Sequence, residues 1–442
     1  MTPVLNPAAW VAHGVGKRED LPLPFPLVVA GASVALVVSF VALGALWRTP
    51  RLHPGGGHPL PATTARLLDS RWLRGGAVAL ALALSAWTLM ALVAGADNAN
   101  NPTPYVVYVW LWIGLPFLSL VLGPVWRVLN PLRALFLLLC RAGGLDPLNG
   151  ILRYRLGYWP AAVGLFAFTW LELIAPDRTT RAVLLPTILG VMLLTLLGAV
   201  VFGPRWFERA DPFEVLSSLY GALSPLGRRP DRTWVVRTPL HGVDRIEADH
   251  GLLATVSVLL GGTAYDGFSG LTAWFSWTQS SASPVAAQTL GLLGFCVLVA
   301  GTLAAAAGLA ARIAGVVSLR GCATAFAPSL VPIAAGYVVA HYWSLWVYGG
   351  QLTLALLSDP LGTGANWLGT RGLTPGSALI GPTFVACLQV TAIVTGHVLG
   401  IVHAHERALR LFDRKAAVRG QVPMLVVMVG YTCGGLVLLF AA

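Results

Sequence analysis

The hydrophobic positions of this chain form long, nearly uninterrupted runs instead of amphipathic repeats. Most of these runs are close to the roughly 20 residues that a helix needs to cross a bilayer. Only helices and closed barrels satisfy the backbone within lipid, and runs without an alternating pattern indicate helices. The pattern therefore predicts an all-α integral membrane protein with about ten transmembrane helices, over residues 26–47, 75–95, 105–123, 158–175, 183–203, 249–265, 286–310, 326–348, 378–402 and 422–440.

Composition and charge agree with this fold class. Of the 442 residues, 56% are hydrophobic and 11% are charged, whereas soluble domains carry about 25% charged residues. The net charge of +11 does not indicate a nucleic-acid partner, because the basic residues lie in short loops between apolar runs, where they set topology and meet anionic headgroups. The five cysteines include no CxxC pair, so neither a disulfide framework nor a thiolate metal site is predicted.

The basic residues also predict the orientation of the chain. The loops after the first, third, fifth, seventh and ninth runs hold 24 of the 29 lysines and arginines. Cytoplasmic loops carry such an excess, so we expect a multi-pass plasma-membrane protein with the N-terminus and the C-terminus outside. The predicted organisation is an extracytoplasmic N-terminal segment, residues 1–25, followed by a single polytopic transmembrane domain, residues 26–440, whose longest cytoplasmic loop is 204–248.

A weak internal repeat follows the third and fifth runs. Each run ends in Gly-Pro, at 123–124 and at 203–204, and is followed by a polar residue and a proline that predict a helix start, with Asn130 and Asp211 as N-caps. The repeat is either a duplicated two-helix unit or the same turn chemistry used twice. The helices that follow are short and amphipathic, so we expect them to lie along the cytoplasmic interface: 131–142 and 212–223.

The apolar run around Phe326–Gly350 contains His341, and an ionisable group within a membrane span is a functional-site hypothesis. In the predicted topology His341 lies in the outer half of its span. Glu172 and Asp266 lie near the outer ends of their spans, and His13 precedes the first span on the same side of the membrane. This set suits a metal ion or a proton relay. The alternative is that each side chain snorkels to water or caps a helix. No HExxH or HxxxH spacing is present, so copper and zinc both stay open.

Other polar residues could continue the site through the membrane. Tyr265 is next to Asp266 in the sequence, and Tyr342 is next to His341. Gln389 and His397 belong to the ninth run, with His397 in its inner half. Two intramembrane histidines at opposite depths suit a polar path for a proton or solute. The next polar residues along the chain, around His403–Glu406, are expected to form a solvated helix end.

Several stretches resemble a family of actinobacterial polytopic membrane proteins labelled fenitrothion hydrolase-like. They are AHGVGKREDLPLP, GYWPAAVGLFAFTWLEL, GGTAYDGFS, FAPSLVPIAAGYVVAHYWSL, TGHVLGIVHAHERAL and GQVPMLVVMVGYT, and they span most of the chain. The resemblance implies a membrane-associated organophosphate hydrolase. It also implies a signal peptide ahead of AHG, so that His13 would be a free N-terminal histidine able to chelate copper. Residues 1–12 depart from that pattern, because they lack a basic region and a proper apolar region.

Three functions follow from these observations. The first is an integral membrane protein with an outward-facing Glu/Asp/His site that handles a metal ion or a proton-coupled small solute. The second is a membrane-embedded hydrolase in which a metal at the same residues activates water. The third is a structural subunit of a membrane-protein complex, with its polar residues serving helix packing. Transport predicts a continuous polar path, hydrolysis predicts a closed pocket with a metal, and a structural role predicts neither.

Overall fold

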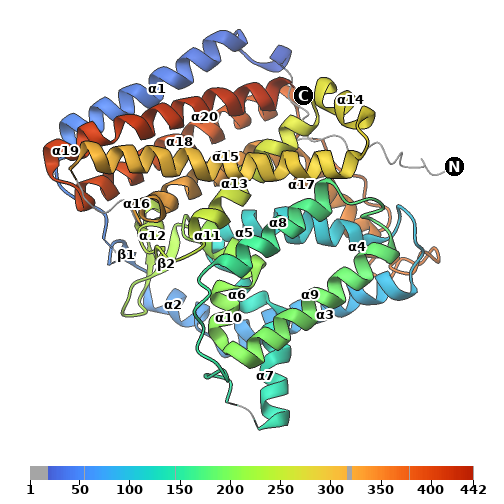
Figure 1. Ribbon diagram of the computed structural model, residues 1–442. Coiled ribbons are helices and arrows are strands. Elements are labelled where there is room, and N and C mark those ends of the chain that lie inside the picture. The colour runs from blue at the N-terminus through green and yellow to red at the C-terminus, as the bar shows by residue number, and fades with distance from the viewer. Residues whose placement is uncertain (1–17, 54, 145, 316–320, 378, 442) are drawn as a thin grey trace.

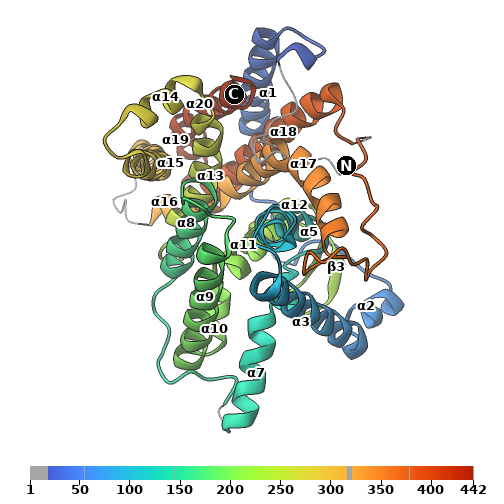
Figure 2. The same cartoon turned by 90° about the vertical axis from the view of Figure 1, so that its right-hand side faces the viewer.

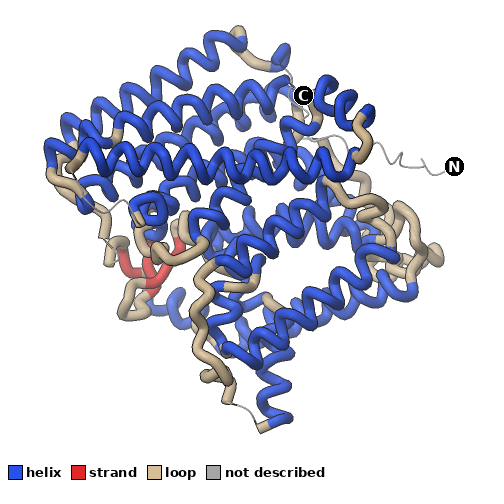
Figure 3. The backbone as a smooth tube through the Cα atoms, viewed as in Figure 1, coloured by secondary structure: helices blue, strands red, loops and turns tan. Residues whose placement is uncertain are grey.

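The computed structural model describes residues 18–53, 55–144, 146–315, 321–377 and 379–441, and nearly all of its regular structure is helical (Figure 3). The exception is a small antiparallel sheet in the order β1-β3-β2. The prediction of an all-α fold is therefore confirmed. The strands are β1 (His58–Pro59), β2 (Leu226–Arg228) and β3 (Trp234–Val236).

Eight helices or helix groups in the described residues are long and apolar enough to cross a membrane. They correspond to eight of the ten predicted runs, which supports a multi-pass membrane protein. They are α1 (Phe25–Leu46), α2–α3 (Ala62–Leu68 and Arg71–Ala94), α4–η3–α5 (Pro102–Tyr105, Val106–Gly114 and Leu115–Leu122), α9 (Arg181–Phe202), α15 (Pro284–Ile313), α16–η4–α17 (Cys322–Phe326, Ala327–Leu330 and Val331–Leu356), α18 (Pro382–Leu411) and α19–α20 (Arg414–Gly420 and Val422–Ala441).

The other two predicted runs form shorter or less apolar helices, α8 (Trp159–Leu173) and α13 (Leu252–Ser269). Most residues of α13 are buried, because it packs against α8, α15 and α17. Most of its glycines, serines and threonines and its aspartate therefore meet protein instead of lipid, which explains its lower hydropathy. The remaining helices are η2 (Arg18–Asp20), α6 (Trp126–Leu129), α7 (Pro131–Gly143), α10 (Pro204–Arg209), α11 (Pro212–Gly221), α12 (Pro239–Val243) and α14 (Thr272–Ser280).

Among the long helices, α1, α20 and α15 follow one common direction across the molecule (Figure 1). When the molecule is turned, α15 is seen nearly end-on (Figure 2). The start of α1, the end of α20 and α14 lie at one end of this bundle, whereas the sheet, α12, α16 and α19 lie at the other (Figure 1). The described parts of the two termini are therefore on the same side, as the loop charges predict.

The helices α17 and α18 are packed backbone to backbone. A Cβ atom on Gly336 would lie 2.4 Å from the Ala392 carbonyl oxygen, and one on Gly396 would lie 2.6 Å from the Pro332 carbonyl oxygen. Gly400, one turn further along α18, lies against the Ser329 carbonyl oxygen of η4 and the Ile333 side chain of α17. Small residues at such a contact let two backbones approach closely in a membrane, where apolar surface alone does not drive helices together. These glycines therefore fix the position of α17 within the bundle.

The two predicted N-caps are confirmed. The Asn130 side chain accepts a hydrogen bond from the backbone of Leu132, and Asp211 accepts bonds from Phe213 and Glu214. Burial raises the pKa of the Asp211 carboxyl to about 6. The two caps also meet, because Asn130 Nδ2 donates to Asp211 Oδ2 over 3.0 Å. Each unit places its short helix against the other unit, with α7 on α9 and α11 on α5, which favours the duplication interpretation.

The structure corrects the expectation that α11 lies along the interface. Eight of its ten residues are buried within the bundle. Its polar residues have partners inside the protein: Arg133 donates to both oxygens of Glu214, and Ser217 bonds Ser119 over 2.8 Å. An amphipathic pattern cannot distinguish this internal polar face from a water-facing one. The other short helix, α7, exposes Leu137, Leu138 and Leu139, and the interfacial position predicted for it stays a prediction.

We predict that Gly396→Ala destabilises the protein, because the added methyl group would collide with the backbone of α17. The melting temperature in detergent, followed by tryptophan fluorescence, should fall by several degrees, in line with the roughly 1–3 kcal/mol cost of overpacking. Gly301→Ala is the matched control, since no atom lies within 4 Å of a Cβ at that position in α15. Equal melting temperatures for the two variants would contradict the close α17–α18 contact.

Candidate functional site

The structure brings together Asp266 of α13 and His341 and Tyr342 of α17. His341 Nε2 lies 2.8 Å from Asp266 Oδ2, and the Tyr342 hydroxyl donates to the same oxygen over 2.9 Å. The three residues are 6%, 7% and 4% exposed. One carboxylate oxygen is thus shared by two groups that can carry protons. We call Asp266, His341 and Tyr342 the aspartate cluster.

Glu172 reaches the aspartate cluster from α8. It is 8% exposed, and its Oε2 atom has no hydrogen-bond partner among the described residues. Glu172 and Asp266 are close enough to interact electrostatically. Two negative charges repel strongly in a medium of low dielectric constant, and a proton or cation held between them removes that repulsion.

Two glycines of α13 position this part of the site. A Cβ atom on Gly261 would lie 2.8 Å from the backbone of Cys296 on α15, and one on Gly262 would lie 3.0 Å from the Thr169 side chain on α8. The helix therefore lies tightly against both neighbours, one turn before Asp266. This packing holds the α8 carboxylate and the α13 carboxylate at the same end of the bundle.

Sequence reasoning missed Trp112, which also belongs to the site. Its indole lies next to Glu172 and Tyr342, although Nε1 makes no hydrogen bond of normal geometry within the described residues. Trp112 lies in η3, a nine-residue π-helical segment that packs against α17. Segments of this kind are rare and occur often at functional sites. The aromatic run VVYVWLWIG is the only signal in the sequence, and it is equally typical of a membrane span.

A small cavity of about 10 Å³ lies beside the aspartate cluster. Its volume is roughly that needed by one water molecule. Three of its lining side chains are polar aromatics, Trp112, Tyr220 and Tyr342, and Tyr220 has a buried hydroxyl group without a hydrogen-bond partner in the described part of the chain. The rest of the lining is mostly apolar: Pro116, Leu216, Leu259, Thr263 and Val338. This space is too small for an organic solute.

The described residues do not form a metal centre. They contain no group of three or more His, Cys, Asp or Glu side chains arranged to hold a metal ion. Glu172, Asp266 and His341 do lie at one end of the bundle, but the fourth predicted ligand, His13, falls outside the described residues. Copper or zinc binding by these four residues therefore stays a prediction.

The remaining residues of the predicted polar path lie apart from the aspartate cluster. The Tyr265 ring packs toward α14 and α15, against Trp274 and Phe295. His397 Nδ1 bonds the Ile393 carbonyl oxygen on its own helix over 2.9 Å. Buried polar atoms of Tyr265, Gln389 and His397 have no hydrogen-bond partner within the described ranges. No hydrogen bond of the described residues joins them to the cluster, so a continuous path stays a prediction.

The expectation of a solvated helix end around His403 is wrong. His403, His405 and Glu406 are at most 1% exposed. His405 bridges the Gln421 side chain and the Trp47 carbonyl oxygen. Glu406 accepts backbone hydrogen bonds from residues 51 and 52 and a bond from the Trp47 indole. These residues connect α18 to the loop after α1, a tertiary role that local polarity does not reveal.

Comparisons with known proteins find nothing similar to this chain. No family model matches it, and neither the curated proteins nor the solved structures include a significant match. The resemblance to fenitrothion hydrolase-like proteins therefore stays a prediction.

We predict that Tyr342→Phe lowers the free energy of unfolding by about 0.5–2 kcal/mol, because Asp266 loses a buried hydrogen bond. Denaturation in mixed detergent measures this change. Tyr348→Phe is the control on the same helix, since Tyr348 is 38% exposed and its hydroxyl makes no hydrogen bond in the described structure. The assignment fails if both variants lose the same stability.

Proposed function

We propose that this multi-pass membrane protein binds a proton from outside the cell at the aspartate cluster and couples that proton to the movement of a small solute or metal ion. One observation carries the proposal: a buried aspartate oxygen is shared by an imidazole and a phenol within a bundle of apolar helices. Ionisable groups in such positions are costly and mark proton relays or ion paths. Glu172 would be the second acceptor, exchanging a proton with the cluster through a water molecule.

The proposed topology has ten spans, with α8 and α13 as the two short ones, in the plasma membrane. The excess of basic residues in alternate loops supports a cytoplasmic position for the sheet, α12, α16 and α19. The aspartate cluster then lies in the outer half of the bundle, where protons enter from the extracytoplasmic side. Burial of α8 and α13 by their neighbours supports their assignment as spans, because short helices inside a bundle need not match the bilayer.

The polar groups of the aspartate cluster suit a proton better than they suit a metal ion. Asp266, His341 and Tyr342 form a network of exchangeable hydrogens with one shared acceptor. The proton between the two groups can reside on the imidazole or on the carboxyl group, so the His341–Asp266 contact can alternate between an ion pair and a neutral hydrogen bond. A metal-dependent hydrolase would need His13 to complete the ligand set, and no contact of the described residues favours that role over proton binding.

The proposal is tested with purified protein in liposomes that contain a pH-sensitive dye. Copper, zinc and small polar solutes would be added outside one at a time. We expect at least one of them to drive proton movement in the wild type and Asp266→Asn to reduce the rate at least tenfold. Glu208→Gln, a change at a partly exposed carboxylate on α10, should keep the wild-type rate. Equal rates in wild type and Asp266→Asn, or no driven proton movement at all, would contradict the proposal.

Metal content of the same preparations separates the two versions of the site. The proton version predicts no stoichiometric metal in the purified protein, as measured by mass spectrometry without added chelator. If the wild type contains stoichiometric copper or zinc, and both Glu172→Ala and His341→Ala lose it, the site holds a resident metal ion instead of a proton.

A further inference from the structure

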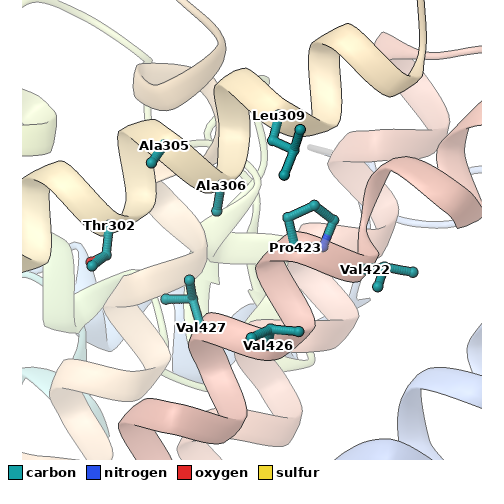
Figure 4. A pocket seen from close by; sticks show the side chains of 8 residues that line it. All are labelled: Thr302, Ala305, Ala306, Leu309, Val422, Pro423, Val426 and Val427. Carbon is teal, nitrogen blue, oxygen red and sulfur yellow. The ribbon is translucent and has the colours of Figure 1, made fainter.

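A groove of about 480 Å³ lies between α15 and α20 on the side of the helix bundle. Figure 4 shows the side chains of the two helices facing each other across it. Four lining positions on α15 repeat at helical spacing, and the small alanines among them leave the space open. The lining residues are Thr302, Ala305, Ala306, Leu309, Val422, Pro423, Val426 and Val427.

The groove is apolar and open to the surroundings of the protein. Leu309 and Val422 are each 48% exposed, and Val426 is 65% exposed. Thr302 is the only polar side chain of the lining, and its hydroxyl group is satisfied by the Leu298 carbonyl oxygen and the Tyr431 hydroxyl. No lining group therefore demands a polar ligand. In a membrane this surface faces lipid, so a hydrocarbon chain is the ligand that fits it.

Two arginines lie at one end of the groove. Arg312 follows Leu309 by three residues on α15 and so shares its face of the helix. Arg419 lies in the last turn of α19, three residues before the groove residue Val422. Gly420 packs against the Ala310 carbonyl oxygen of α15, which brings the two arginines to the same end. Both are exposed, and neither has a hydrogen bond or ion pair with another described residue.

We propose that the groove binds an anionic glycerophospholipid, with one acyl chain between α15 and α20 and the phosphate at Arg312 and Arg419. The groove alone gives little selectivity, because lipid tails are as apolar as the side chains that line it. Selectivity comes from the arginines, since a guanidinium group binds a phosphate through two parallel hydrogen bonds. This site is separate from the aspartate cluster and does not depend on the function proposed for it.

Native mass spectrometry of the detergent-solubilised protein tests the proposal. Phosphatidylglycerol and phosphatidylcholine with identical chains would be titrated separately. We expect tighter binding of phosphatidylglycerol, and we expect that preference to fall about fivefold for each arginine removed in Arg312→Gln and Arg419→Gln. Arg66→Gln, an exposed arginine of α2, is the control and should leave the preference unchanged. A wild type without preference, or an unchanged preference in the double variant, would overturn the proposal.

A second variant tests the place of the acyl chain. Ala305→Phe puts a large side chain into the groove from an exposed position, so it should weaken binding of both lipids while leaving the melting temperature unchanged. Unaltered binding of both lipids would place the lipid elsewhere. Conversion of a dimer into a monomer by Ala305→Phe, with lipid preference intact, would show that the groove instead holds a second copy of the chain.

Discussion

The burial of α17 is the constraint on which the rest of the structure depends. Most residues of α17 are buried, and a buried polar group must find its partner within the protein, because lipid offers none. On one face Gly336 lies against the backbone of α18, and toward the outer end His341 and Tyr342 bond Asp266 of α13. The first contact sets the position of the helix, and the second sets its rotation, since turning α17 would leave the Asp266 carboxylate without these donors.

The same logic explains the polar groups at the opposite end of the bundle. Glu406 of α18 is fully buried, yet its oxygens accept bonds from the loop after α1 and from Arg410. Asp244, just after α12, receives another bond from Arg410 over 2.7 Å. Both oxygens of the Glu406 carboxylate have partners, and the network joins three segments far apart in the sequence, so its role is structural. The cluster around Asp266 differs, because Glu172 beside it keeps a buried oxygen without a partner in the described residues. That difference is why we assign function to the outer cluster only.

Hydropathy and loop charge were sufficient to predict much of this fold. Eight runs form helices of membrane-spanning length, and the described parts of the termini lie on one side. The contact between Asp266 and His341 was also within reach, because the topology placed both residues at one depth. Depth alone says nothing about which helices are neighbours, so the meeting of α13 and α17 had to come from the structure.

All but one of the features that the sequence concealed share one physical cause. Glu214 and Ser217 on α11, and His405 and Glu406 on α18, read as polar faces turned to water, but tertiary partners bury them. A periodic pattern records only that a face is polar and not what lies against it. Trp112 was hidden for the opposite reason, since an aromatic residue in a membrane span needs no explanation until a carboxylate is found beside it.

The most direct test of the account is an infrared measurement of protonation at Asp266. Difference spectra of the purified protein between acidic and alkaline pH report the gain or loss of a proton by buried carboxyl groups. The account predicts a carboxyl band that changes with pH in the wild type, that disappears in Asp266→Asn and that persists in Asp231→Asn, a change at an exposed aspartate. A spectrum that is identical in wild type and Asp266→Asn would show that the cluster does not exchange a proton and would leave it a structural contact between α13 and α17.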